Sequence, residues 1–212
     1  MVTANLLYAD QGLKSLESVV NMELQESSRL AHLYGLSKTH KAKLSMRPIL
    51  SATRTYNFKL AKWLEEILKP LSVNEYTITD AFEFADQIRS ISMNKEDILV
   101  SYDMTALFTN VPSNETINIL VDKAFTNDWF NQTYYLNIEK EELAQLLEVA
   151  TTNQLFQFDG HLYEQTDGVA LGCRLGLLMG NVFMCHLEEK LACDGMVPPL
   201  YKRYINDTLA NI

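Results

Sequence analysis

Residues 98–108 read ILVSYDMTALF: a short apolar run ends at the acid Asp103, and an aromatic residue, Phe108, follows five positions later. Apolar runs of this length are consistent with a buried β-strand. A carboxylate at the end of such a strand is costly to desolvate unless a cation or a hydrogen-bond donor lies nearby. Asp103 therefore has two interpretations: a carboxylate of a functional site, or a structural acid that caps the following turn.

A polar turn near the C-terminal end is the second feature of interest. Strand-like runs at 200–205 and 208–212 flank Asn206 and Asp207. We expect a β-hairpin here, with an Asn-Asp turn that places both polar side chains at its tip. Asn and Asp are also good turn formers in their own right, so an ordinary turn is the alternative interpretation.

A glycine-containing loop lies between these two segments. Residues 165–172 read QTDGVALG, and a stretch expected to be helical follows over 175–192. Glycines allow close backbone approach, and helix N-termini suit phosphate groups. The loop is consistent with a site for a phosphate or a paired base, or with an ordinary turn before a core helix.

The remaining pattern is a mixture of helices and strands. Asp80 is a candidate N-cap, with Glu83 completing a capping box. Residues 155–164 predict a β-hairpin, because Asp159-Gly160 suits a type I′ turn in which both central residues have positive φ. Residues 34–51 predict a loop and a short strand. Apolar residues at helical spacing predict further helices over 13–33, 58–71, 78–91, 112–125 and 139–151.

Composition excludes several classes of protein. The 212 residues make one domain or about one and a half, and 47% apolar with 21% charged residues is ordinary for a folded chain. No apolar run reaches the ~18 residues that span a bilayer, and residues 1–10 lack the features of a signal peptide. The three cysteines form no CxxC motif and favour a reducing, intracellular compartment over a disulfide framework.

Charge is unevenly distributed along the chain. The net charge is −9, yet residues 29–69 contain nine Lys or Arg residues against two acids, Glu65 and Glu66. This window carries +7, so the remainder carries −16. Such asymmetry suggests one face that binds anions. A solvated basic face is the alternative interpretation.

Taken together and in this order, the segments resemble the reverse transcriptase domain of Penelope-like retroelements, over roughly residues 31–212. The segments are specific jointly rather than singly. They are LYGLSKTHK (33–41) with RPI (47–49), VSYD (100–103) through FTNVP (108–112), YEQTDG (163–168) and RYINDT (203–208).

The resemblance implies an α+β fold, a right-hand polymerase with fingers and palm in which helices pack on an antiparallel palm sheet. It also implies three parts: an N-terminal helical extension (1–30), a fingers-like basic segment (31–97) and a palm-like domain with a finger insertion (98–212). The sequence ends at Ile212, inside the second strand of the expected hairpin. We therefore expect the thumb to be missing and the grip on a primer–template to be poor.

The resemblance further implies an RNA-directed DNA polymerase, a nucleotidyltransferase that adds a dNTP to a primer 3′-hydroxyl with two Mg²⁺ ions. The implied partners are an RNA template, a DNA primer and a dNTP, with no membrane, and the implied location is intracellular, the nucleus included. Asp103 and Asp207 match metal ligands, and Phe108 matches the aromatic residue that excludes a ribose 2′-hydroxyl. The catalytic positions are Asp103, Asn206 and Asp207; the nucleotide-binding positions are Lys38, Arg47, Phe108, Gln165 and Gly168; Lys41 and Lys43 are nucleic-acid-binding positions.

Two substitutions depart from the family pattern. Asn206 stands where the family has the first Asp of Tyr-x-Asp-Asp. At ~4 Å and an effective dielectric of ~20 the lost charge pair is worth about 4 kcal/mol, enough to slow chemistry on the order of a hundredfold or more. Residues 172–177 read GCRLGL in place of Gly-Ser-Pro-Leu-Ser-Pro, and Gly176 and Gly180 weaken the helix by roughly 1 kcal/mol each.

These departures predict that polymerase activity is weak or absent. Two alternatives stay open: a nucleic-acid-binding module without catalysis, and an inert remnant of a retroelement.

Overall fold

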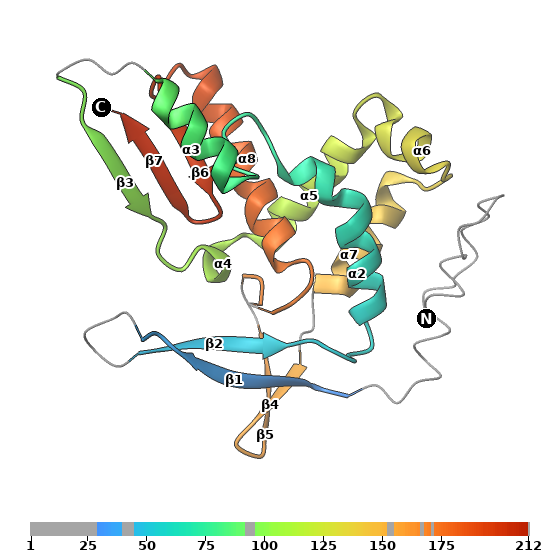
Figure 1. Cartoon of the computed structure of the whole chain (residues 1–212). Helices are drawn as coiled ribbons and strands as arrows, with labels where there is room; N and C mark the ends of the chain where they lie inside the picture. The colour runs from blue at the N-terminus through green and yellow to red at the C-terminus, as the bar shows by residue number, and fades with distance from the viewer. Residues whose placement is uncertain are drawn as a thin grey trace.

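The computed structural model describes residues 29–39, 45–91, 96–151, 155–165, 168–170 and 172–211. It shows a mixed fold of helices and antiparallel sheets (Figure 1). In chain order the elements are β1 (Ala31–Ser37), β2 (Met46–Ser51), α2 (Phe58–Leu68), η1 (Lys69–Ser72), α3 (Ala81–Ser90), β3 (Leu99–Asp103), α4 (Leu107–Asn110), α5 (Ser113–Phe125), η2 (Thr126–Asp128), α6 (Trp129–Tyr134), α7 (Lys140–Thr151), β4 (Leu155–Phe158), β5 (His161–Glu164), α8 (Gly176–Cys193), β6 (Tyr201–Tyr204) and β7 (Asp207–Asn211).

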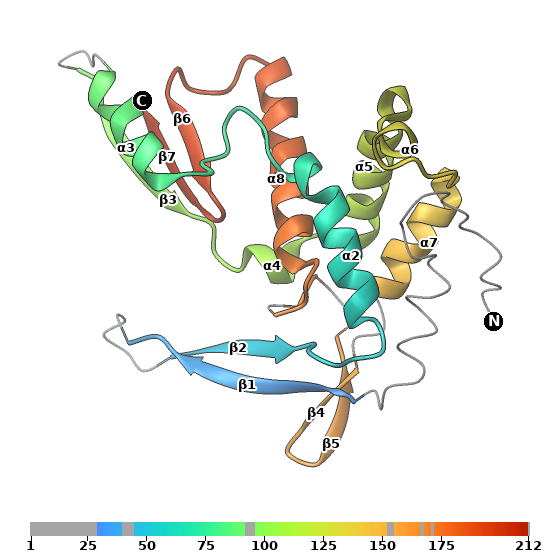
Figure 2. The ribbon, with the colours of Figure 1, turned by 45° about the vertical axis from the view of Figure 1, so that its right-hand side comes forward.

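The strands form two sheets. A four-stranded sheet has the order β2-β1-β4-β5, in which only the β1–β4 pair is parallel. A three-stranded sheet has the order β3-β7-β6 and is antiparallel throughout. Figures 1 and 2 show the three-stranded sheet beside α3 and α8. The four-stranded sheet lies below the lower ends of α2, α7 and α8 in these views.

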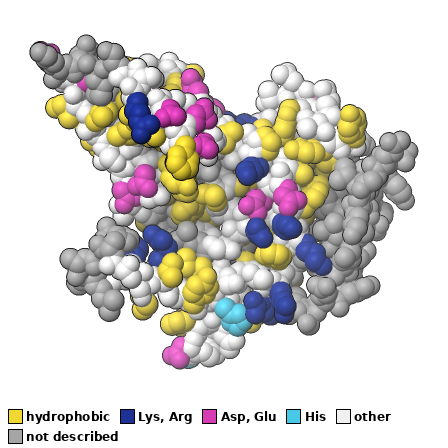
Figure 3. All heavy atoms as spheres, in the orientation of Figure 1, with side chains coloured by type: hydrophobic (Ala, Val, Ile, Leu, Met, Phe, Trp, Pro, Cys, Tyr) yellow, Lys and Arg dark blue, Asp and Glu magenta, His cyan; other side chains and the backbone are white. Residues whose placement is uncertain are grey.

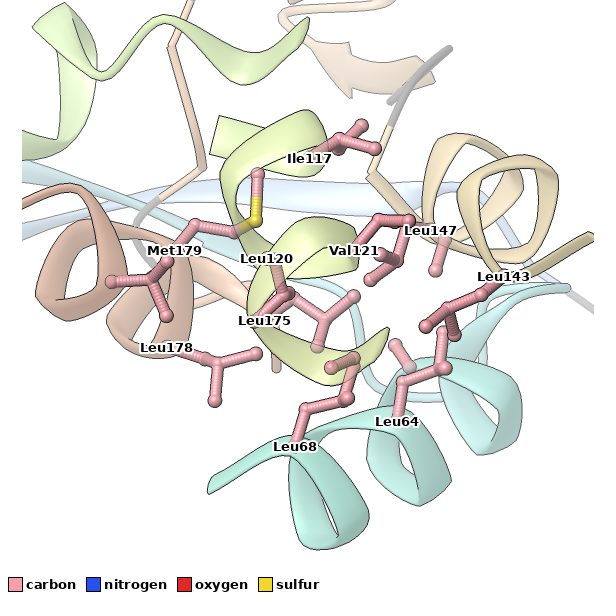
Figure 4. Close-up of a cluster of buried hydrophobic side chains, with 14 of the residues drawn as sticks. Leu64, Leu68, Ile117, Leu120, Val121, Leu143, Leu147, Leu175, Leu178 and Met179 are labelled. Carbon is pink, nitrogen blue, oxygen red and sulfur yellow. The ribbon is translucent and has the colours of Figure 1, made fainter. Parts of the chain in front are cut away.

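The core lies where α2, α5, α7 and the start of α8 meet (Figure 4). Each helix contributes apolar side chains at a spacing of three or four residues, which places them on one face. Full burial stabilises each by roughly 1.5–3 kcal/mol. The central side chains are Leu64 and Leu68 from α2, Leu120 and Val121 from α5, Leu143 and Leu147 from α7, and Leu178 and Met179 from α8.

Local sequence signals predicted most elements correctly. The Asp80 side chain accepts bonds from the backbone N–H groups of Phe82 and Glu83, as an N-cap does. The Glu83 carboxylate, expected to complete a capping box, accepts from Gln87 Nε2 instead, 3.2 Å away. Asp159 and Gly160 both have positive φ (48° and 77°), as a type I′ turn requires. The helices expected over 112–125, 139–151 and 175–192 are present within one residue of each end. The helix expected over 58–71 is α2 followed by the 3₁₀ turn η1, and the one expected over 78–91 is α3, which begins three residues later than expected.

The helix expected over 13–33 is wrong in its last three residues, which begin strand β1. Ala31 is buried while His32 is exposed, so burial alternates with the period of a strand. The partners of β1 are β2 and β4, which come later in the chain. Residues 34–51, expected to be a loop and a short strand, supply most of that antiparallel pair. The part of the expected helix before residue 29 lies outside the described residues.

Strand pairing crosses the expected boundary between fingers and palm. The β4–β5 hairpin joins β1 and β2 in one sheet, and α2 shares its core with α5, α7 and α8. The division into 1–30, 31–97 and 98–212 stays a prediction. Within the described part of the chain, no helix is long and apolar enough to span a bilayer.

Candidate active site

The two predicted aspartates meet at one end of the three-stranded sheet. Asp103 ends β3 and Asp207 begins β7, and the two residues are direct cross-strand partners. Tyr204, the last residue of β6, pairs with Asp207 from the other side. Directly opposed residues on antiparallel strands point to the same face. All three residues are exposed, so this row of side chains forms an open surface.

The tip of the hairpin differs by one residue from the expected Asn-Asp turn. Because Tyr204 pairs with Asp207, the two-residue turn consists of Ile205 and Asn206, and Asp207 already belongs to β7. Ile205 has φ of +57°. Positive φ is unfavourable for a β-branched residue, so surrounding contacts must hold this conformation.

Asn206 joins the hairpin tip to the end of β3 through two hydrogen bonds. Its side-chain Nδ2 donates to Asp103 Oδ1 at 2.6 Å. Its backbone carbonyl accepts from the N–H of Met104 at 2.9 Å. The structure thus brings Asp103, Asn206 and Asp207 together, and a neutral amide occupies one lone pair of the Asp103 carboxylate.

This site offers a cation two carboxylates, those of Asp103 and Asp207. Among the described residues, no group of three or more His, Cys, Asp and Glu side chains is placed to hold a metal ion. Mg²⁺ is commonly bound by one or two carboxylates together with substrate phosphates. Asp103 and Asp207 match that pattern, with the Asn206 amide occupying part of the acceptor capacity of Asp103 Oδ1.

The glycine loop and Phe108 lie side by side. The N–H of Val169 donates to the Phe108 carbonyl at 2.8 Å, and Ser113 Oγ donates to the Gly168 carbonyl at 3.1 Å. Gly168 has φ of +69°, and a Cβ there would lie 2.6 Å from the Thr109 carbonyl oxygen. Only glycine fits this approach, so the loop is fixed against the helix that follows Asp103.

The expected basic residues belong to the other sheet. Arg47 lies on β2 opposite Leu36 and is exposed. Lys38 follows β1, and its N–H donates to the Ser45 carbonyl at 2.9 Å. Gln165 follows β5 and is half-buried. Lys41 and Lys43 lie outside the described residues.

Figure 3 shows where charge gathers on one face of the molecule. Lys and Arg side chains lie over α2 and the four-stranded sheet, with Asp and Glu side chains among them, and acidic side chains lie beside a basic one over α3. On α2 the two lysines, Lys59 and Lys62, are matched by Glu65 and Glu66, and Lys62 pairs with Glu66 at 3.7 Å. The excess positive charge of residues 29–69 therefore comes from the segments outside α2.

A buried ion pair behind the hairpin was missed by the sequence reasoning. The Arg203 and Glu188 side chains are 0% and 2% exposed, and Arg203 Nε donates to Glu188 Oε1 at 2.5 Å. Burial and the nearby Glu188 charge raise the pKa of Tyr201, whose hydroxyl donates to the same carboxylate, to about 12. A polar stripe on the apolar helix α8 was the available signal: Asn181, Cys185 and Glu188 share one face and all contact Arg203.

Comparisons with known proteins identify the fold. No family model matches the chain, and no curated protein matches it in sequence. Telomerase from Candida albicans, solved in complex with a fragment of telomeric RNA, superposes with a TM-score of 0.60 at 13% identity, over 98% of this chain and 40% of that one. Apo telomerase from Candida tropicalis superposes with a TM-score of 0.58 at 11% identity, over 96% and 40%.

A Candida tropicalis telomerase that lacks its C-terminal domain superposes with a TM-score of 0.56 at 12% identity, over 96% of this chain and 51% of that one. The chain thus spans 40–51% of the length of these telomerases. The fold is reverse transcriptase-like. At 11–13% identity, the likeness establishes the fold and leaves the activity to be argued from the residues.

Proposed function

We propose that the chain is the fingers and palm of an RNA-directed DNA polymerase from a Penelope-like retroelement, with catalysis impaired by Asn206. The observation that carries this proposal is the pairing of Asp103 with Asp207 across β3 and β7, with Asn206 between them at the tip. The telomerase-like fold supports it.

In this proposal the two aspartates hold Mg²⁺ together with the triphosphate of a dNTP. Bound magnesium would activate the attacking oxygen and stabilise the leaving group. Phe108, on α4, and Gly168, in the loop that packs on α4, form the wall that would accept a deoxyribose. Lys38 and Arg47 are assigned to the triphosphate, and Lys41 and Lys43, which lie outside the described residues, are assigned to the RNA template and DNA primer.

Asn206 impairs this chemistry in two ways. It lacks the negative charge that a third carboxylate would supply, worth about 4 kcal/mol at ~4 Å and an effective dielectric of ~20. Its amide also donates to Asp103 Oδ1 at 2.6 Å, so it competes with a cation for this oxygen of the carboxylate. Slow or undetectable primer extension follows.

The test compares this chain with its Asn206→Asp variant on an RNA template with a DNA primer. We expect Mg²⁺-dependent extension at least a hundredfold faster in the variant. Without metal the variant loses a hydrogen bond and gains a like charge, which costs about 1–3 kcal/mol. Mg²⁺ should therefore raise the melting temperature of the variant more than that of the parent chain.

The control combines Asn206→Asp with Asp103→Asn, which restores the number of carboxylates while removing the first metal ligand. Extension and the Mg²⁺-dependent shift in melting temperature should both vanish in it. If the single variant shows neither effect, the polymerase proposal is wrong.

The second candidate is a nucleic-acid-binding module without catalysis. The hydrogen bond from Asn206 to Asp103 favours it, because it satisfies the carboxylate without a metal ion. The basic residues of the β1–β2 pair, Lys38 after β1 and the exposed Arg47 on β2, supply the means of binding. RNA binding without extension by the Asn206→Asp variant would support this candidate over the first.

A further inference from the structure

The buried Arg203–Glu188 ion pair lies behind the hairpin and contacts its tip. Arg203 is buried on the helix-facing side of β6, while Tyr204, the next residue, lies on the exposed side. Its guanidinium is held on α8 from two directions: Nε and Nη2 donate to Glu188 at 2.5 and 3.2 Å, and Nη1 donates to Asn181 at 2.9 Å.

The same guanidinium reaches the tip of the hairpin. Arg203 Nη1 also donates to the carbonyl oxygen of Ile205 at 3.3 Å. Ile205 is the β-branched residue at positive φ, a conformation that persists only where the surroundings hold it. Asn206 and Asp207, the residues that approach Asp103, follow immediately.

The main chain of Arg203 is anchored as well. Its N–H donates to the Tyr76 carbonyl, and its own carbonyl accepts from the N–H of Ile78, both at 2.8 Å. This pairing covers the outer edge of β6. The strand before the tip therefore cannot shift without breaking bonds to both the main chain and the side chain.

We propose that Arg203, held by Glu188, is a positioning residue that fixes the hairpin tip so that Asn206 and Asp207 lie against Asp103. The planar guanidinium is required, because one group must bond Glu188, Asn181 and Ile205 at fixed angles, which a lysine ammonium cannot do. The inference concerns the site of the proposed function and rests on that function for its catalytic meaning.

The experiment measures hydrogen exchange of the Met104 N–H, which reports the tip because it donates to the Asn206 carbonyl. The Val169 N–H, which donates to Phe108, is the reference outside the hairpin. Two changes are compared with the parent chain: Arg203→Lys, and the double change Arg203→Met with Glu188→Met. Replacing both members of a buried pair with apolar residues is often tolerated, so the double variant retains a folded core.

The matched control removes a second ion pair on α8. Lys123 Nζ lies 2.6 Å from Glu189 Oε1 and joins α5 to α8 at the residue after Glu188. The double change Lys123→Met with Glu189→Met therefore perturbs the same helix without touching the hairpin.

We expect exchange at Met104 to accelerate at least tenfold relative to Val169 in both Arg203 variants and to stay within twofold in the control. Equal loss of protection at Met104 and Val169 would overturn the inference, because the ion pair would then stabilise the whole chain. An unchanged ratio of the two exchange rates in a folded variant would overturn it as well. The readout needs neither Mg²⁺ nor primer. An inactive Asn206→Asp variant would therefore refute the polymerase proposal and leave the positioning role of Arg203 untouched. An unchanged ratio of exchange rates would refute the positioning role and leave the polymerase proposal untouched.

Discussion

A single carboxylate, Glu188, sets the properties of its neighbours. It accepts from the Tyr201 hydroxyl at 3.1 Å and from Asn74 Nδ2 at 2.9 Å, besides its bonds to Arg203. Burial is the main cause that raises the pKa of Tyr201 to about 12, and the negative charge of Glu188 adds to it. The folded chain therefore retains the Tyr201 proton at a pH where the unfolded chain has released it.

This difference predicts how stability depends on pH. Between pH 10 and 12 the folded state binds more protons than the unfolded state, so the free energy of unfolding should fall as pH rises. The contribution is fully present below pH 10. Urea unfolding at pH 9, 10.5 and 11.5 should show a steeper fall in the parent chain than in Tyr201→Phe. Tyr135→Phe, at an 83% exposed position, controls for the loss of one tyrosine; equal slopes for parent and Tyr201→Phe would contradict the prediction.

Two glycines at positive φ, Gly160 and Gly168, differ in the space around them, so the cost of backbone strain can be measured apart from the cost of a steric clash. Gly160 has open space around its Cβ position, whereas a Cβ at Gly168 would lie 2.6 Å from the Thr109 carbonyl oxygen. Gly160→Ala should cost only the roughly 1–2 kcal/mol of a left-handed backbone. Gly168→Ala should cost more and displace the loop from Phe108. Denaturant unfolding of both variants measures the difference, and equal costs would show that the contact does not hold the loop.

At the scale of elements, the two glycines of α8 have a packing role that the sequence did not indicate. The sequence suggested that Gly176 and Gly180 merely weaken the helix. The structure shows that a Cβ at Gly176 would lie 2.8 Å from the Ala170 carbonyl oxygen, and one at Gly180 would lie 3.1 Å from the Phe108 ring. Both glycines allow the loop and α4 to pack closely on α8.

This packing predicts different outcomes for the same substitution. Gly176→Ala meets a backbone oxygen at the first residue of α8, where helix propensity contributes little, so it should destabilise the chain by about 1 kcal/mol or more. Gly180→Ala meets the edge of a half-buried ring that can rotate, so this contact and the gain of roughly 1 kcal/mol in helix propensity should nearly cancel. Thermal unfolding distinguishes them; a destabilised Gly180→Ala with a neutral Gly176→Ala would reverse the packing argument.

Elements with a strong local signal could be predicted from sequence, and those set by distant partners could not. Asp80 caps its helix and Asp159-Gly160 makes its turn because the chemistry lies within a few residues. The first three residues of β1 were expected to be helical, because their strand conformation depends on pairing with β2 and β4. The candidate site shows the same division. The motifs that resemble a reverse transcriptase predicted that Asp103 and Asp207 lie together, as the pairing of β3 with β7 has them, whereas the Arg203–Glu188 pair depends on how α8 meets β6.

At the scale of the molecule, the proposed catalytic residues and the proposed nucleotide-binding arginine belong to different sheets. The three-stranded sheet presents Asp103 and Asp207, and the four-stranded sheet carries Arg47. The glycine loop lies between them: Gly168 packs on α4, and a Cβ at Gly172 would lie 2.4 Å from the Leu50 carbonyl oxygen of β2. A nucleic acid bound to the basic residues of the β1–β2 pair would therefore lie beside the loop that holds Phe108.

Binding through the β1–β2 pair should depend strongly on salt. Each phosphate contact contributes about 0.7–0.9 to the slope of log K against log salt concentration. Arg47→Gln should therefore weaken RNA binding and reduce the slope by about 1. Arg89→Gln is the matched control, because it removes the same charge from α3, where Arg89 pairs with Asp86 at 2.8 Å. Fluorescence anisotropy across 50–300 mM salt measures both. An unchanged slope in Arg47→Gln, or an equal change in Arg89→Gln, would mean that net charge rather than β2 governs binding, and the template surface would have to be sought elsewhere.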